Sequence, residues 1–240
     1  MSIPAIIGHR GACGHAPENT LASIRKAAEL GAKWVEFDTM LSADNQVILF
    51  HDDSLERTTG ISGNVADTNW QKLQTLDAGD WFASQYSGEG IPLLSDVISL
   101  LDELRIGAVI EIKPSKGREI ETARLSATLV SDIWPNSLPT PILSSFSEQA
   151  LKVAREYAPH IPRALNMWRS IGGWKSRLKE LDCAALHCKQ NLLNKKKAGA
   201  VLAAGYDLRC FTVNEPERAR ELFNWGVGSI FTDFPDRFFE

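Results

Sequence analysis

The chain has 240 residues, 44% of them hydrophobic and 23% charged, a composition typical of a soluble globular protein. Its formal net charge of -4 argues against nucleic acid as the main partner, because nucleic-acid-binding proteins normally carry a basic surface. No stretch reaches the roughly 20 apolar residues of a membrane span, and the 4 cysteines lack the spacing of zinc ligands. We therefore expect a cytoplasmic protein with reduced cysteines, no export signal and no membrane anchor.

A short apolar strand is predicted over 6–10, and it brings His9 and Arg10 to its carboxyl end. Asn19 or Thr20 then caps a helix, since either side chain can accept a hydrogen bond from the first helical turn. A further strand follows this helix, and the alternation of strand and helix indicates an α/β protein.

Two carboxylates lie two residues apart in the next strand, which begins at Trp34. Side chains alternate across a strand, so Glu36 and Asp38 share one face with Trp34. Burying a carboxylate is so unfavourable that it either stays protonated or meets a positive partner, and one divalent cation serves two carboxylates at once. The alternative, a pair of acids on a solvated strand, is disfavoured by the apolar neighbours Val35 and Phe37.

The polar stretch that ends with Asp44 and Asn45 is too short for the crossover that a parallel neighbour requires. The strand over 47–51 is therefore expected to return as the second strand of a hairpin. If Asp44 and Asn45 are the two turn residues, His51 lies directly opposite Asp38 and on the same face. The hairpin would then place a histidine beside the acid pair.

The segment over about 52–92 is polar and rich in glycine, and a stretch of this length between core elements is usually a functional insertion. We expect it to form a small lobe within a single domain that covers 1–240. Its aromatic residues Trp70, Trp81 and Phe82 are expected to form the core of this lobe.

A second apolar strand with charged residues is predicted over 108–114. Its Glu111 and Lys113 share one face with Val109. The two charges form either a salt bridge within one strand or part of a binding site, and a buried pair is weak support for a purely stabilising role.

Further strands are predicted over 141–144, 163–166, 184–187, 208–213 and 228–232, with helices that include 147–157 and 216–224. Without the return strand of the hairpin, eight strands alternate with helices. This pattern favours an eight-stranded parallel (β/α)8 TIM barrel with a small inserted lobe after the second strand, and an open doubly wound sheet is the alternative. In a barrel the loops after the strands gather at one end, so these strand-end residues should converge: His9, Arg10, Glu36, Asp38, Glu111 and Lys113.

This set of side chains suits a phosphate-containing substrate. A guanidinium matches phosphate oxygens, and an imidazole transfers protons near neutral pH. The carboxylates of Glu36, Asp38 and Glu111 offer the oxygen ligands that Mg²⁺ and Ca²⁺ prefer. The chain has no phosphate-binding GxxxxGKS or GxxxxGKT loop, no GxGxxG and no GxSxG, which argues against nucleoside triphosphate, dinucleotide and serine hydrolase chemistry.

Short motifs occur in a fixed order over nearly the whole chain: His9-Arg10-Gly11, Pro17-Glu18-Asn19-Thr20, Glu36-Phe37-Asp38, His51-Asp52, Leu55-Glu56-Arg57-Thr58-Thr59-Gly60, Asp77-Ala78-Gly79, Trp81-Phe82, Ile91-Pro92-Leu93-Leu94, Glu111-Ile112-Lys113, Thr212-Val213-Asn214 and Thr232-Asp233-Phe234-Pro235. As an ordered set, they resemble the glycerophosphodiester phosphodiesterases. The resemblance implies a barrel with a lobe inserted after the second strand. It also implies hydrolysis of small-molecule glycerophosphodiesters, such as glycerophosphocholine or glycerophosphoethanolamine, to glycerol 3-phosphate and an alcohol.

The resemblance also assigns roles to residues of this chain. The metal ligands would be Glu36, Asp38 and Glu111, the acid-base pair His9 and His51, and the phosphate-binding residues Arg10 and Lys113. The family usually has a tryptophan immediately before Thr-Val-Asn, whereas this chain has Phe211. Phe211 keeps an aromatic ring for packing against the substrate glycerol but lacks the indole N–H.

Several alternatives stay open from the sequence. Mg²⁺ is the expected cation and Ca²⁺ the second choice. The nucleophile is either water or the neighbouring glycerol hydroxyl, and the protein is either a monomer or a homodimer. The competing functions are a lipid phosphodiesterase that acts at a membrane surface and an inactive phosphate-binding barrel.

Overall fold

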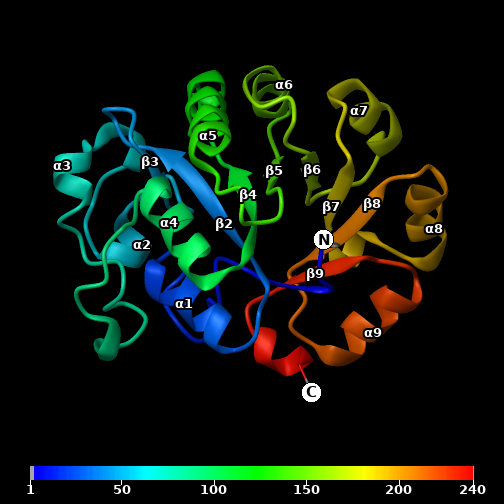
Figure 1. The fold of residues 1–240 in the computed structure, drawn as a ribbon, viewed down its shortest axis with the longest axis horizontal. Helices are drawn as coiled ribbons and strands as arrows, with labels where there is room; N and C mark the ends of the chain where they lie inside the picture. The colour runs from blue at the N-terminus through cyan, green and yellow to red at the C-terminus, as the bar shows by residue number, and fades with distance from the viewer. Residues whose placement is uncertain (1–2, 240) are drawn as a thin grey trace.

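Eight parallel strands close into a barrel in the computed structural model, which describes residues 3–239 (Figure 1). The strands are β1 (Ile6–Gly8), β2 (Trp34–Leu41), β4 (Gly107–Ile112), β5 (Ile142–Ser145), β6 (Arg163–Met167), β7 (Ala185–Lys189), β8 (Asp207–Phe211) and β9 (Ser229–Thr232). Gly8 of β1 closes the ring, because it pairs with Val35 on one side and with Thr232 on the other. The predicted TIM barrel is therefore confirmed, and the alternative of an open sheet is wrong.

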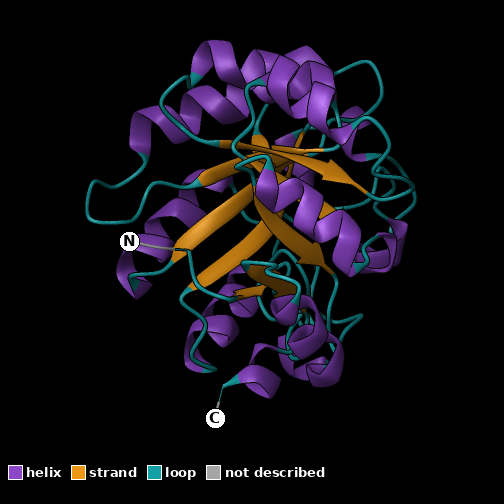
Figure 2. Cartoon of the chain, turned by 90° about the vertical axis from the view of Figure 1, so that its right-hand side faces the viewer, coloured by secondary structure: helices purple, strands orange, loops and turns teal. Residues whose placement is uncertain are grey.

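Helices surround the barrel on its outside (Figure 2). They are α1 (Leu21–Glu29), α4 (Leu94–Leu104), α5 (Glu119–Ile133), α6 (Glu148–Tyr157), α7 (Trp174–Leu181), α8 (Lys195–Ala203) and α9 (Pro216–Asn224). Thr20, one of the two predicted candidates, caps α1 by accepting a hydrogen bond from the Ser23 N–H at 3.2 Å. Within residues 3–239, none of the helices has the length and apolar character needed to cross a membrane.

The side chains of each barrel strand alternate between the inside and the outside of the barrel, as the sequence pattern predicted. Trp34 and Val109 belong to the apolar cluster inside the barrel, whereas Val35 and Phe37 belong to the large cluster that also contains residues of the surrounding helices. Towards the carboxyl ends of the strands the inward-facing residues become polar, beginning with Glu36. The barrel interior is thus apolar in the middle and polar at one end.

The hairpin strand β3 (Val47–Leu49) pairs antiparallel with β2, as predicted, but its register differs from the expected one by one residue. Asn45 adopts a left-handed φ of 66°, which is typical of a turn one residue longer than the expected two-residue turn. Phe50 rather than His51 therefore lies opposite Asp38, and the Phe50 N–H donates to the Asp38 carbonyl at 3.2 Å. The predicted pairing of His51 with Asp38 is wrong.

The insertion forms the predicted lobe beside β3, at the left of Figure 1. It contains the short helices α2 (Glu56–Thr59) and α3 (Trp70–Leu73) and the 3₁₀ helices η1 (Val65–Asp67) and η2 (Ser84–Tyr86). Trp70 packs against the apolar cluster of the lobe, as expected. Trp81 is 41% exposed, so the expectation that it is part of the lobe core is wrong.

Candidate active site

A cavity of about 840 Å³ opens where the barrel strands end. Its lining includes all the residues predicted for the site: His9, Arg10, Glu36, Asp38, His51, Glu111, Lys113 and Phe211. The structure therefore brings together side chains that lie up to 202 residues apart in the sequence, from His9 to Phe211. Their chemical roles stay predictions.

Three buried carboxylates form the centre of this cavity. Asp38 of β2 and Glu111 of β4 are register partners on adjacent strands, and Glu36 precedes Asp38 on the same face. One oxygen from each carboxylate lies within 4.8 Å of the others. We call Glu36, Asp38 and Glu111 the acid triad. A set made only of carboxylate oxygens suits a hard divalent cation such as Mg²⁺ or Ca²⁺.

Only part of the negative charge of the acid triad is neutralised by nearby cations. Arg10 Nε lies 3.4 Å from Asp38 Oδ2, and Lys113 Nζ lies 3.8 Å from Asp38 Oδ1. Although burial opposes ionisation, these two cations lower the pKa of Asp38 to about 2. Burial and the charge of Asp38 raise the pKa of Glu111 to about 8, and they also raise the pKa of Glu36. Glu111 Oε1 is buried without a hydrogen-bond partner among the described residues, so the acid triad fits a divalent cation.

A network of polar residues holds His9 in place. Its Nδ1 lies 2.7 Å from Asp233 Oδ1, while its Nε2 lies 4.0 Å from Glu36 Oε2 and so faces the acid triad. Asn214 Nδ2 donates to Asp233 Oδ2 at 2.7 Å, and Cys13 Sγ donates to Asp233 Oδ1 at 2.9 Å. These contacts keep Asp233 ionised by lowering its pKa despite burial. Asp233 and Asn214 thus orient His9, a role that the sequence motifs alone did not reveal.

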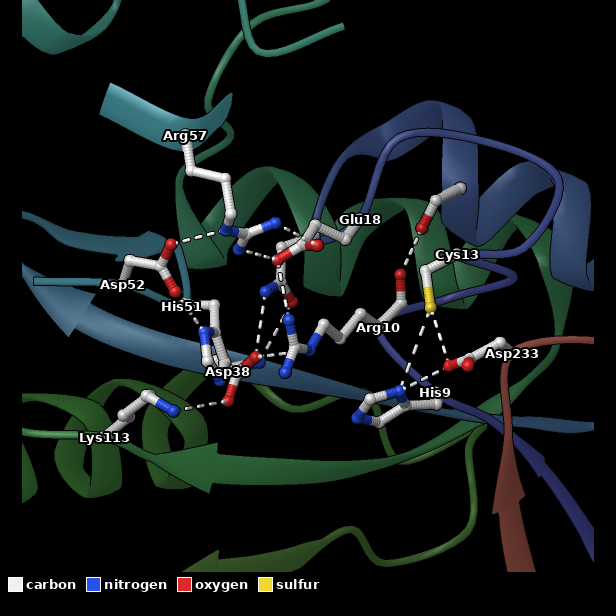
Figure 3. Close-up of polar contacts among 12 residues, drawn as sticks. His9, Arg10, Cys13, Glu18, Asp38, His51, Asp52, Arg57, Lys113 and Asp233 are labelled. Carbon is white, nitrogen blue, oxygen red and sulfur yellow. Dashed lines mark hydrogen bonds and ion pairs between the residues drawn. The ribbon is translucent and has the colours of Figure 1, made fainter. Parts of the chain in front are cut away.

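His51 is held by a chain of charges that begins in the inserted lobe (Figure 3). His51 Nδ1 lies 2.5 Å from Asp52 Oδ1, and Arg57 Nε donates to Asp52 Oδ2 at 2.5 Å. Arg57 also binds Glu18 with two N–H groups, and Glu18 in turn accepts from Arg10 Nη1 at 2.7 Å. The lobe thereby positions both His51 and Arg10, which explains why its polar motif contains an arginine.

Local backbone geometry explains two of the sequence motifs. Gly11 has a φ of +85°, and a Cβ at this position would lie 2.0 Å from Ser23 Oγ, so no larger residue fits after Arg10. Asn19 also has a positive φ, and its side chain donates to Asp38 Oδ2 at 2.9 Å and accepts from the Asp38 N–H at 3.1 Å. Asn19 therefore orients a member of the acid triad, while the helix cap is left to Thr20.

The opposite wall of the cavity comes from β5 to β8 and was largely missed in the sequence, apart from Phe211. Phe211 and Phe146 pack edge to face with ring centres 5.8 Å apart. Asn166 Nδ2 donates to Glu111 Oε2 at 2.9 Å, and the exposed Trp168 lies at the rim. His187 and Lys189 of β7 also line this wall. These residues lie singly within the strands or directly after them, without the paired carboxylates that marked the acid triad in the sequence.

Comparisons with known proteins connect this geometry with a family. Residues 9–237 match the glycerophosphoryl diester phosphodiesterase family. The Bacillus subtilis protein YhdW, provisionally named as a glycerophosphodiester phosphodiesterase, is 35% identical over 237 residues, which cover 96% of this chain and 95% of that protein. The glycerophosphodiester phosphodiesterase of Bacillus altitudinis is 31% identical over 236 residues, which cover 97% of this chain and 95% of that protein.

Among solved structures, a phosphodiesterase of Oleispira antarctica in complex with the product sn-glycerol-3-phosphate is 40% identical to this chain. Its TM-score is 0.95, and the match covers 98% of this chain and 95% of that one.

Proposed function

The chain belongs to the glycerophosphoryl diester phosphodiesterase family and is an enzyme with that activity, and from this premise we propose its substrates and mechanism. We propose that it hydrolyses water-soluble glycerophosphodiesters, such as glycerophosphocholine and glycerophosphoethanolamine, to glycerol 3-phosphate and an alcohol. The observation that carries this proposal is the placement of the acid triad, two cations and two carboxylate-bound histidines in one cavity. The product complex of the Oleispira antarctica relative supports it.

In our proposal, different residues of the cavity have different roles in phosphodiester cleavage. A divalent cation held by Glu36, Asp38 and Glu111, Mg²⁺ in our proposal, would supply positive charge for the phosphoryl oxygens. Arg10 and Lys113 add charged donors beside it. Because the Nδ1 atoms of both histidines lie beside aspartates, their Nε2 atoms are left for proton transfer.

In this mechanism one histidine takes the proton of the nucleophile and the other protonates the leaving alkoxide. In Figure 3, His51 lies to the left of the Arg10 guanidinium and His9 lies below the Arg10 side chain. Since Asp52 and Arg57 belong to the lobe and contribute to this arrangement, we propose that the barrel and the lobe work as one catalytic domain. The aromatic ring of Phe211 would pack against the glycerol carbons.

Metal removal tests the proposed cofactor. Protein stripped with EDTA is expected to release almost no glycerol 3-phosphate from glycerophosphocholine, and added Mg²⁺ should restore release, with Ca²⁺ as the comparison ion. Coupled assay of glycerol 3-phosphate measures the product, and circular dichroism confirms that the stripped protein stays folded. Full activity of the stripped, folded protein would contradict the role of the acid triad.

The orientation of His9 gives a second prediction. Replacing Asp233 with Asn keeps the shape of the side chain but removes its charge, so imidazolium formation at His9 loses a charge-assisted hydrogen bond. Such a bond is worth roughly 1.5–3 kcal/mol, which corresponds to a loss of about 10- to 100-fold in kcat. The measurement is kcat and KM from pH 5 to 9, with the exposed Asp132→Asn as the control for removal of one charge. An unchanged pH profile and kcat would contradict the positioning role.

A second candidate function is that of a lipid phosphodiesterase that acts at a membrane surface. It is favoured by the exposed aromatic residues at the rim of the cavity. Trp168 is 53% exposed and Phe146 is 37% exposed, and both line the cavity. Aromatic side chains at a rim can insert into a lipid surface. Comparing rates on soluble glycerophosphodiesters with rates on phospholipid vesicles decides between the two candidates, because only an enzyme that acts on lipids would work equally well on the vesicles.

A further inference from the structure

A second group of metal-ligating side chains lies on the side of the His9 ring that faces away from the acid triad. It consists of His9 through Nδ1, Cys13 and Asp233, and one ligand atom from each lies within 4.8 Å of the others. We call these three residues the Cys13 cluster. Figure 3 shows their side chains pointing toward one another. The proposed mechanism gives the thiol of this cluster no part in the chemistry.

The spacing of the three ligand atoms is close to that of a zinc site. Asp233 Oδ1 lies 2.7 Å from His9 Nδ1 and 2.9 Å from Cys13 Sγ. Cys13 Sγ lies 3.8 Å from His9 Nδ1. In tetrahedral zinc sites, bonds of roughly 2.0–2.3 Å place two ligand atoms roughly 3.3–3.6 Å apart. Side-chain shifts of about half an ångström would therefore admit the ion between these atoms.

Backbone hydrogen bonds hold the members of the Cys13 cluster together. The His9 N–H donates to the Thr232 carbonyl at 2.8 Å, which fixes the loop after β1 against the end of β9. The Cys13 N–H donates to the His9 carbonyl at 3.4 Å, and the Gly14 N–H donates to the Asp233 carbonyl at 3.0 Å. Because the ligands are already assembled, binding a metal would cost little conformational entropy.

The charge of the cluster favours a cation. Asp233 is ionised, and among residues 3–239 its single ion-pair partner is His9, which is charged only when protonated. Asn214 and Cys13 contribute neutral donors. The side chains of His9 and Asp233 are 18% and 24% exposed, so the cluster is open to ions from solvent. A partly buried carboxylate without a full counterion gains from a bound metal ion.

The ligand set also distinguishes this cluster from the acid triad. Sulfur, imidazole nitrogen and carboxylate oxygen together are typical ligands of Zn²⁺, whereas Mg²⁺ and Ca²⁺ prefer oxygen alone. The sequence gave no sign of such a site, because Asp233 lies 220 positions from Cys13. Two neighbouring groups of ligands thus differ in the metals that they suit.

We propose that the Cys13 cluster binds Zn²⁺ through Cys13 Sγ, His9 Nδ1 and Asp233 Oδ1, with water as the fourth ligand, and that zinc bound there inhibits the enzyme. Binding releases the thiol proton to solvent. With Nδ1 on zinc, the neutral imidazole of His9 carries its proton on Nε2, the atom that faces the acid triad. His9 then cannot accept a proton from the nucleophile. The inhibitory part of the proposal rests on the proposed function.

Without metal, the thiol of Cys13 keeps its proton. Burial and the charge of Asp233 raise the pKa of Cys13, so the thiol donates to Asp233. A metal ion has to displace this proton, as it does in other thiolate sites. The cluster therefore alternates between a hydrogen-bonded form, in which His9 is free to act, and a zinc form, in which it is not.

Binding is tested with Co²⁺, which replaces Zn²⁺ in tetrahedral sites and gives a charge-transfer band in the near ultraviolet when it is bound to a thiolate. Saturating Mg²⁺ occupies the acid triad, which has no sulfur and cannot give this band. We expect one equivalent of thiolate-bound Co²⁺, displaced by Zn²⁺. Cys13→Ser should abolish the band. Cys183→Ser is the matched control, since the Cys183 thiol is buried elsewhere, and it should keep the band.

Inhibition is measured as the release of glycerol 3-phosphate from glycerophosphocholine at saturating Mg²⁺ with increasing Zn²⁺. Each variant is compared with its own rate without zinc. Cys13→Ser should raise the zinc concentration for half inhibition by at least about 100-fold, because losing a group that only supports a ligand already costs roughly 10- to 100-fold in metal affinity. Cys183→Ser should respond to zinc as wild type does.

Alkylation of the unmodified protein keeps the test decisive if Cys13→Ser does not fold. All 4 cysteines lie within the described residues, and Cys13 is the one that is not buried. Native-state alkylation, mapped by mass spectrometry, should label Cys13, and Zn²⁺ should slow this reaction. The zinc site would be overturned by the absence of a thiolate band with Co²⁺, by a band that survives in Cys13→Ser, or by alkylation that Zn²⁺ does not slow.

The two parts of the proposal can fail separately. A thiolate band without inhibition by Zn²⁺ would overturn the inhibitory role of the site. A protein that is inactive even without zinc would refute the proposed function and the inhibitory role with it. The Co²⁺ band and the alkylation need no catalysis, so they decide whether the metal site exists in either case.

Discussion

Replacement of His51 by asparagine is expected to lower kcat for glycerophosphocholine by about a hundred- to ten-thousand-fold, the contribution of a positioned acid or base. His51 lines the cavity, and its Nδ1 lies 2.5 Å from Asp52, so the variant loses proton transfer but keeps a polar side chain near Asp52. KM should change little, because the charges of Arg10 and Lys113 stay in place. Steady-state kinetics at saturating Mg²⁺ measures both constants.

His160 provides the control for this substitution. It lies exposed on the surface, where the change to asparagine should affect neither kcat nor thermal stability. A His51→Asn enzyme that retains more than a tenth of wild-type kcat would show that His51 is not one of the two proton-transfer groups.

Glu111→Gln is expected to affect activity and stability in opposite directions. Losing one charged ligand of the acid triad weakens the electrostatic stabilisation of the transition state, and activity should fall by about 10²- to 10³-fold. In the metal-free protein, burial and Asp38 raise the pKa of Glu111 from 4.5 to about 8. The folded state therefore binds this proton more tightly than the unfolded state does, and the stabilisation present below pH 4.5 is lost as the pH rises towards 8. Because a glutamine side chain has no proton to lose in this range, the Glu111→Gln variant does not lose this stabilisation as the pH rises.

Thermal unfolding at pH 5 and pH 8, with EDTA or with Mg²⁺, measures the effect. In EDTA, the thermal stability of Glu111→Gln should exceed that of wild type by a larger margin at pH 8 than at pH 5. Added Mg²⁺ should stabilise wild type and have a smaller effect on the variant, because a ligand stabilises the state that binds it. The exposed Glu156→Gln serves as the control. An equal response of wild type and Glu111→Gln to Mg²⁺ would rule out Glu111 as a ligand.

The features that follow from local sequence periodicity were predictable. Alternation along a strand placed Glu36 and Asp38 on the inner face, and the strand and helix pattern predicted the barrel itself. The register of the hairpin was not predictable in this way. It depends on the left-handed conformation of Asn45, and a change of one residue in a turn moves every pair of the ladder.

The supporting residues of the site were also beyond the reach of local patterns. Asp233 contacts His9 across 224 positions of sequence, and Arg57 reaches Glu18 across 39. Such contacts depend on the closed fold, and nothing in the residues next to Asp233 indicates a histidine partner.

The pairing of β1 with β9 has a consequence for the synthesis of the protein. His9 is made early, but its partner Asp233 comes from the segment that directly follows the last strand of the barrel. A nascent chain that lacks this segment has the acid triad, Arg10 and both histidines, yet His9 has no carboxylate to orient it. Closure of the ring and placement of Asp233 beside His9 are therefore the same event. If His9 transfers protons as proposed, the return of activity during refolding should report the docking of β9 against β1.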